Sequence, residues 1–186
     1  MNKISIVNSV CAFGLIAGLA LNGSAALAVE ALPPAVQAKT DLYKKKLVEW
    51  AANPTIVAAT KEANAKGALA GMTNVKWNDL DEKDAAVKAF ETSTAGTLIR
   101  KWEEDKGINK LVLRDEKANL VAASTKPLLF SIPARPAYVM AIKGQVWAAA
   151  EIKPDPSTGI KSVQASAPVM DGGKVIGVIH AGITAD

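Results

Sequence analysis

The chain has 186 residues, of which 49% are hydrophobic, 22% charged and 5% aromatic, and its formal net charge is +4. This length allows one ordinary domain with a full hydrophobic core. The composition excludes a disordered, collagen-like or coiled-coil protein, and the absence of a basic stripe interleaved with aromatic residues argues against nucleic acid as a partner.

Residues 1–28 have the pattern of a secretory signal peptide. Lys3 supplies a positive start, an apolar run extends over Val10–Leu21, and Ala26-Leu27-Ala28 is a cleavage site of the A-x-A type. We expect cleavage after this site and a periplasmic mature protein made of residues 29–186. An uncleaved membrane anchor is the alternative, which the shortness of the apolar run disfavours.

The only cysteine, Cys11, lies inside that apolar run. The expected mature chain therefore has no disulfide, no thiolate nucleophile and no cysteine-ligated metal. We expect no cofactor. The mature sequence also contains no apolar run long enough to span a bilayer, so it is expected to be soluble.

The first half of the mature sequence has helical character. Three stretches predict helices: Ala35–Ala52, Thr55–Ala65 and Asp84–Asp105. The first of them carries apolar residues that predict one buried stripe: Val36, Leu42, Tyr43, Leu47 and Trp50. Asn53-Pro54 is expected to end the first helix and begin the second. Gly71–Lys76 is expected to form a loop, and Thr92–Gly96 to interrupt the third helical stretch.

From Gly107 onwards the sequence predicts strands. Five runs have the composition or alternation of strands: Asn109–Arg114, Leu120–Ser124, Gln145–Ile152, Ile160–Val169 and Lys174–Ile183. Asn119 is expected to take the left-handed conformation in the first hairpin turn. A helical run followed by a strand run predicts an α+β fold, with N-terminal helices packed on an antiparallel sheet of five to six strands.

The connection Ser124–Trp147 is the best candidate for a binding region, because long irregular connections in small domains often bind ligands. It combines cationic with aromatic side chains: Lys126, Phe130, Arg135, Tyr138 and Trp147. Such a combination suits a small anionic or zwitterionic ligand. The alternative is a cover of core-packing aromatic residues with cations on its surface.

The only histidine, His180, lies on the last expected strand. It can be a hydrogen-bonded structural residue, a ligand contact, a pH-responsive group or a metal ligand. No nucleophile or acid is marked beside it, and no G-x-S-x-G, H-E-x-x-H or phosphate-loop motif occurs. The sequence therefore predicts neither catalytic residues nor a metal site, and Asp155 is expected to stabilise its own turn.

The order of these elements resembles the Cache (PDC, periplasmic PAS-like) sensor domains. The segments that carry the resemblance are W-x-x-N-P at Trp50–Pro54, W-N-D-L-D at Trp77–Asp81, and S-A-P-V-M-D-G-G-K-V-I-G-V at Ser166–Val178. The resemblance implies a single Cache domain over residues 29–186, with a long N-terminal helix on a PAS-like sheet. It also implies a pocket for a small metabolite such as an organic acid, an amino acid or an amine. By position, this pocket would draw on Lys126, Phe130, Arg135, Tyr138 and Trp147, with His180 near its floor.

Members of this family usually lie between two membrane helices and act on a kinase or a chemoreceptor. No second membrane segment or output domain is visible here, so we expect the signal to pass to a membrane receptor or kinase partner. The family also implies a homodimer through the N-terminal helix. The alternative function is a periplasmic protein-interaction module without a small ligand. An enzyme is the weakest hypothesis, because one histidine, no mature cysteine and no acid–base pair leave little for catalysis.

Overall fold

The structure is a computed structural model, and it describes residues 31–186. The expected signal peptide and its cleavage site lie outside the described residues. Within the described part, no helix has the length and apolar character needed to cross a membrane.

The described residues form six helices: α1 (Pro34–Ala51), α2 (Pro54–Lys66), α3 (Asn74–Asp79), α4 (Ala85–Thr92), α5 (Thr94–Glu103) and α6 (Pro136–Ala141). Proline occupies the first turn of α1, α2 and α6, where its fixed φ favours a helix start. The Asn53 side chain caps α2 by accepting a hydrogen bond from the backbone N–H of Thr55 at 2.9 Å. Ser93 caps α5 in the same way and separates it from α4, which confirms the expected interruption.

The loop expected over Gly71–Lys76 is wrong in its second half, because α3 begins at Asn74. The Thr73 hydroxyl caps this helix by accepting a hydrogen bond from the backbone N–H of Lys76 at 3.2 Å. Trp77 on α3 is fully buried, and its indole N–H donates to the carbonyl of Pro127 at 2.7 Å. The short helix is therefore held by a contact that is distant in the sequence.

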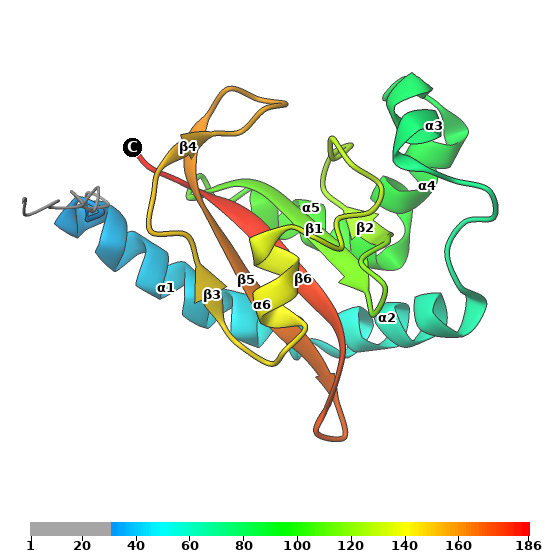
Figure 1. Cartoon of the computed structure of the whole chain (residues 1–186), viewed down its shortest axis with the longest axis horizontal. Coiled ribbons are helices and arrows are strands. Elements are labelled where there is room, and N and C mark those ends of the chain that lie inside the picture. The colour runs from blue at the N-terminus through cyan, green and yellow to red at the C-terminus, as the bar shows by residue number, and fades with distance from the viewer. Residues whose placement is uncertain (1–30) are drawn as a thin grey trace, which may run out of the picture.

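Six strands make one antiparallel sheet: β1 (Ile108–Asp115), β2 (Leu120–Ala123), β3 (Trp147–Ala148), β4 (Lys153–Pro154), β5 (Lys161–Asp171) and β6 (Lys174–Thr184). The order across the sheet is β2-β1-β6-β5-β3, and β4 also pairs with β5. Figure 1 shows β5 and β6 as the longest strands, with β6 at the centre of the sheet. This confirms the expected α+β fold with N-terminal helices on an antiparallel sheet.

Two details of the strand prediction are wrong. The strand expected over Gln145–Ile152 keeps only the two residues of β3, because the chain then leaves the edge of β5 and runs along the mouth of a cavity. In the first hairpin turn Ala118, and not Asn119, has a positive φ of 70°. The Asp115 carboxylate fixes this turn by accepting hydrogen bonds from the backbone N–H groups of Lys117 and Asn119, both at 2.8 Å.

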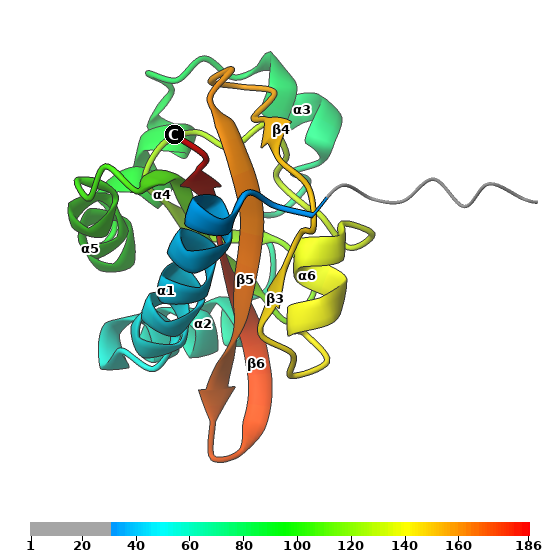
Figure 2. The ribbon, with the colours of Figure 1, turned by 90° about the vertical axis from the view of Figure 1, so that its left-hand side faces the viewer.

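The two faces of the sheet are covered differently. α1, α2 and α5 cover one face, which we call the helix face, whereas α6 and the chain around β3 and β4 cover the other, the pocket face (Figure 2). Side chains that point to the helix face are apolar and buried: Leu111, Leu113, Val163, Ala165, Ala167, Ile179, Ala181 and Ile183. The alternation of side chains along a strand places the residues between them on the pocket face.

The stripe expected on α1 is confirmed for Val36, Tyr43 and Leu47, which are buried, whereas Leu42 is 52% exposed. The Tyr43 hydroxyl donates to Asp105 at 2.5 Å, and the Lys46 ammonium group pairs with the same carboxylate at 2.6 Å. These contacts join α1 to the turn that enters β1. Lys46, the last residue of the run Lys44-Lys45-Lys46, is therefore engaged within the protein.

Candidate ligand-binding pocket

A cavity of about 340 Å³ lies on the pocket face of the sheet. Strands β1, β5 and β6 form its floor, while α6, the chain that precedes it and the chain around β3 and β4 form its walls. The polar or backbone floor positions are Lys110, Arg114, Ser162, Gln164, His180 and Gly182. A cavity of this size fits a small metabolite and is near the lower limit for ligand sites in general.

The register of the strands brings these residues together from distant parts of the sequence. On β1, Lys110 and Arg114 lie four residues apart and therefore share one face. His180 on β6 lies opposite Val112 of β1 and opposite Ser166 of β5. Ser166 in turn lies opposite Trp147 of β3, so one row across the sheet connects the histidine to an aromatic wall.

Arg114 is the most unusual residue of the pocket, since its side chain is charged but only 1% of the residue is exposed. Its Nε–H donates to His180 Nε2 at 3.2 Å, and its two terminal nitrogens donate to the carbonyls of Phe130 at 2.6 Å and Leu129 at 3.1 Å. Within residues 31–186, no carboxylate lies within ion-pairing distance of this guanidinium group. Buried charges in proteins are normally paired.

Burial lowers the pKa of Arg114 to about 9, and nearby Asp115 opposes this shift. At neutral pH the guanidinium group is therefore still charged. The carboxylate of Asp115 does not neutralise it directly, because that carboxylate accepts hydrogen bonds from the hairpin turn. The floor of the pocket thus carries a buried positive charge.

His180 is held in its neutral form. Burial, together with the positive charges of Arg114 and Lys110, lowers the pKa of His180 to about 3. Because its Nε2 accepts the hydrogen bond from Arg114, the proton of the neutral ring lies on Nδ1. The ring lines the cavity and can therefore offer an N–H donor beside the guanidinium group.

At the other end of the floor, Lys110 reaches the turn between β4 and β5. Its ammonium group donates to the Ser157 hydroxyl and lies 3.9 Å from the Asp155 carboxylate. Asp155 accepts hydrogen bonds from the backbone N–H groups of Ser157 and Thr158, at 2.9 and 3.1 Å, which confirms its expected role in the turn. Burial by itself raises the pKa of Asp155. The hydrogen bonds from Ser157 and Thr158 and the positive charge of Lys110 outweigh this effect, so the pKa is lowered.

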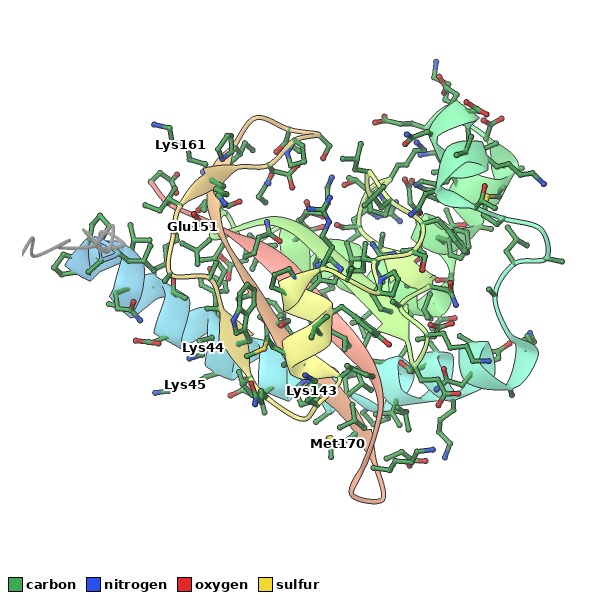
Figure 3. All side chains as sticks on the ribbon, in the orientation of Figure 1. Lys44, Lys45, Lys143, Glu151, Lys161 and Met170 are labelled. Atoms are coloured by element: carbon green, nitrogen blue, oxygen red, sulfur yellow. The ribbon has the colours of Figure 1, made fainter. Side chains whose placement is uncertain are left out.

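Three of the six residues expected in the binding site line this cavity: Arg135, Trp147 and His180. Arg135 is exposed at the rim, immediately before α6, and Trp147 forms a half-buried wall on β3. Glu151 lies on the outer part of the same edge, as Figure 3 shows, and forms an ion pair with Lys153 at 2.5 Å. The negative charge of Glu151 therefore offsets part of the positive charge of this wall.

The other three expected residues lie in the layers that support the cavity. Phe130 packs against Trp77 with ring centroids 5.7 Å apart, and the Lys126 ammonium group lies 5.3 Å from the centre of the Trp77 ring. Tyr138 is buried, and its hydroxyl donates to the carbonyl of Glu116 at 2.7 Å. Phe130 still influences the cavity, because its carbonyl orients Arg114.

Arg114, Lys110 and the polar residues of β5 line the cavity but were not expected there from the sequence. A usable signal was present in the first strand, where Lys110 and Arg114 recur with even spacing in an otherwise apolar run. Charged residues at even spacing lie on one strand face, and in a central strand that face is covered. In residues 31–186, no group of three or more His, Cys, Asp or Glu residues is arranged to hold a metal ion.

Comparison with solved structures shows similarity to bacterial sensor domains. The sensor domain of the Vibrio cholerae histidine kinase DctB is 17% identical, with a TM-score of 0.42, over 81% of this chain and 57% of that one. The sensory domain of the Campylobacter jejuni chemoreceptor Tlp3 with isoleucine bound is 14% identical, with a TM-score of 0.40, over 82% of this chain and 64% of that one. The chain thus spans about three fifths of the length of these structures.

The sequence resembles Cache sensor domains, and these two solved structures are likewise sensor domains, one of a histidine kinase and one of a chemoreceptor. An extracellular ligand-binding receptor from Desulfohalobium retbaense is also similar, with 16% identity and a TM-score of 0.41, over 71% of this chain and 25% of that one. The sequence matches no protein-family model and no curated protein. The kind of ligand must therefore be inferred from the residues that line the pocket of this chain.

Proposed function

We propose that this protein is an extracytoplasmic sensor domain that binds a small organic anion on the pocket face of its sheet. The observation that carries the proposal is the charged Arg114 side chain, which lies buried on the cavity floor and has no carboxylate partner in residues 31–186. A bound carboxylate would supply the missing negative charge through charge-assisted hydrogen bonds. The neutral His180 ring would add a further donor at the same end of the cavity.

The rest of the cavity supports a ligand with a short apolar body. Val112 on the floor and Leu128, Leu129 and Trp147 on the walls surround the space beyond the guanidinium group. Arg135 at the rim would favour the approach of anions over that of amines. A small organic acid therefore fits the charge and the volume better than an amine. From the sequence alone, an organic acid, an amino acid and an amine were all possible ligands.

The test is calorimetric titration with sodium salts of short monocarboxylic acids, alongside amides and amines of the same carbon number. We expect the acids alone to bind, and Arg114→Met to weaken them about a hundredfold, because removing one partner of a buried charge pair costs roughly 2–5 kcal/mol. Arg100→Met is the matched control, since Arg100 is exposed on α5, which covers the helix face. Equal binding of acids and amines, or unchanged affinity in Arg114→Met, would contradict the proposal.

Export and domain organisation belong to the same proposal. We infer that residues 1–28 are removed during secretion and that residues 29–186 act in the periplasm as one sensor domain. Intact-mass measurement on protein from the periplasmic fraction tests this inference. A mass that still includes residues 1–28 would instead indicate a membrane-anchored form.

A protein partner is the second part of the proposal, and α1 is the surface that supports it. Leu42 and Val48 on α1 are 52% and 44% exposed, and Val146 lies beside Lys44, Lys45 and Val48. Figure 3 shows Lys44 and Lys45 on the outer side of this helix. The same surface favours the alternative function, an interaction module without a small ligand. Light scattering of the protein and of Val48→Glu tests whether α1 joins two copies or is free for a receptor or kinase.

A further inference from the structure

A second feature of the cavity floor lies beyond the charged end. Gly182 on β6 lies opposite Lys110 of β1 and opposite Gln164 of β5. A Cβ atom at this position would lie 3.1 Å from Ser162 Oγ and 3.4 Å from Gln164 Nε2. Two polar side chains therefore converge closely on the point where any larger residue would place its Cβ atom. We call this place the Gly182 notch.

The Gly182 notch contains a hydrogen-bonding group that the fold does not use. Ser162 is 1% exposed, and its hydroxyl has no hydrogen-bond partner among the described residues. A buried hydroxyl without a partner costs free energy, so such groups usually have a structural or functional reason. Ser162, Gln164 and Gly182 all belong to the lining of the cavity, so this hydroxyl lies at the cavity wall.

The position of the notch relative to Arg114 limits the ligand. The guanidinium group reaches His180, which precedes Gly182 by two residues on the same strand. Two residues of strand span about 7 Å. A ligand whose carboxylate pairs with Arg114 would therefore place a polar group in the notch after a short carbon chain.

We propose that the Gly182 notch is a hydrogen-bonding subsite that selects organic acids with a neutral oxygen at the end opposite the carboxylate. A terminal hydroxyl group fits, because it can accept from the Gln164 amide and donate its proton to the Ser162 hydroxyl oxygen. A second carboxylate fits less well, since the nearest cation, Lys110, is already engaged with Ser157 and Asp155. This inference rests on the proposed binding of an anion by Arg114.

The experiment compares pentanoate with 5-hydroxypentanoate by calorimetric titration of the wild-type protein. We expect the hydroxy acid to bind about tenfold more tightly, which corresponds to one buried hydrogen bond. In Ser162→Ala the ratio of the two affinities should fall to near one. Gly182→Ala should also abolish the preference, because its methyl group would displace the Ser162 hydroxyl and the Gln164 amide that form the notch.

Ser166→Ala is the matched control, because Ser166 is on the same strand and its hydroxyl is likewise buried without a partner in residues 31–186, but it does not line the cavity. The preference for the hydroxy acid should survive in this variant. Equal affinities of the two acids for the wild-type protein would overturn the subsite while leaving anion binding intact. Loss of the preference in Ser166→Ala would also overturn it. If neither acid binds, the proposed function fails and the subsite fails with it.

Discussion

The same strands present an apolar face to the helices and a polar face to the cavity. On β6, Ile179 and Ile183 point into the dry layer under α1, whereas His180 between them points to the cavity. On β5, Val163 and Ala165 face the helices, and Ser162 and Gln164 face the cavity. The helix face stabilises the fold through apolar burial. In residues 31–186, the pocket face holds the Arg114 charge without a carboxylate partner, and buried hydroxyl groups of Ser162 and Ser166 without hydrogen-bond partners. One strand can therefore supply apolar packing on one face and unsatisfied polar groups on the other.

The largest expected effect tests the helix face. Ile179→Ala should lower the free energy of unfolding by about 3 kcal/mol, because it opens a cavity in a fully buried layer. Ile160→Ala is the control, since Ile160 is 46% exposed and should change stability by less than about 1 kcal/mol. Urea unfolding of both variants provides the measurement. Similar losses in the two variants would show that the layer under α1 is not the stabilising one.

The next effect concerns the histidine of the pocket face. The pKa of His180 is lowered to about 3 in the folded protein, so between this value and about 6.5 the unfolded chain binds more protons than the folded one. Stability is therefore complete above about pH 6.5 and falls as the pH is lowered. We expect a loss of about 2 kcal/mol between about pH 7 and about pH 4.5.

His180→Gln should remove most of this pH dependence, because glutamine does not titrate. Denaturant unfolding at several pH values, with both proteins in the same buffers, gives the comparison. A wild-type curve that is flat over this range would mean that the histidine accepts a proton in the folded protein. That result would also contradict the tautomer derived from the Arg114 hydrogen bond.

A smaller effect is expected at the edge of the helix face. Hydrogen bonds from Lys46 and Tyr43 lower the pKa of Asp105 to about 2. The stabilisation is present above the unfolded pKa of about 3.9 and is lost as the pH falls toward 2. Because Asp105 is 37% exposed, Asp105→Asn should cost only about 1 kcal/mol at neutral pH. Thermal unfolding at neutral and acidic pH checks that the two proteins converge under acid.

The smallest expected effect is a gain in stability rather than a loss. Ser166→Ala should leave stability unchanged or raise it by about 0.5 kcal/mol, because it removes a buried hydroxyl without a partner in the described structure. Calorimetric melting temperatures of the two proteins are sufficient to see this. A clear loss of stability would show that the pocket face depends on this hydroxyl for its packing, and the contrast between the faces would be weaker.

The sequence predicted the order of elements well, because helical and strand periods are local. Of the six residues expected in the site, Arg135, Trp147 and His180 line the cavity, and their role in binding stays a prediction. It did not predict Arg114, because a charged residue in a strand can equally well face solvent. Which face is covered depends on how residues 125–146 fold back, and that is fixed by long-range contacts such as the bond from Trp77 to Pro127.

Long-range contacts also explain why Phe130 and Tyr138 do not line the cavity. Phe130 and Tyr138 have the chemistry of pocket walls, but each is used to fasten the connection to the rest of the protein. Local sequence does not distinguish an aromatic residue that faces a ligand from one that holds the wall behind it. Only the register of the connection over the sheet separates the two cases.

The central position of β6 has a consequence for how the chain folds. β6 follows every other described element in the sequence, yet it lies between β1 and β5 and pairs with both. Its pairing with β1 joins segments about 65 residues apart, as in the pair Leu113 and Ile179. Contacts of this kind form slowly, because a long loop must close before they contribute. The nascent chain should therefore be unable to complete its sheet until β6 has been synthesised.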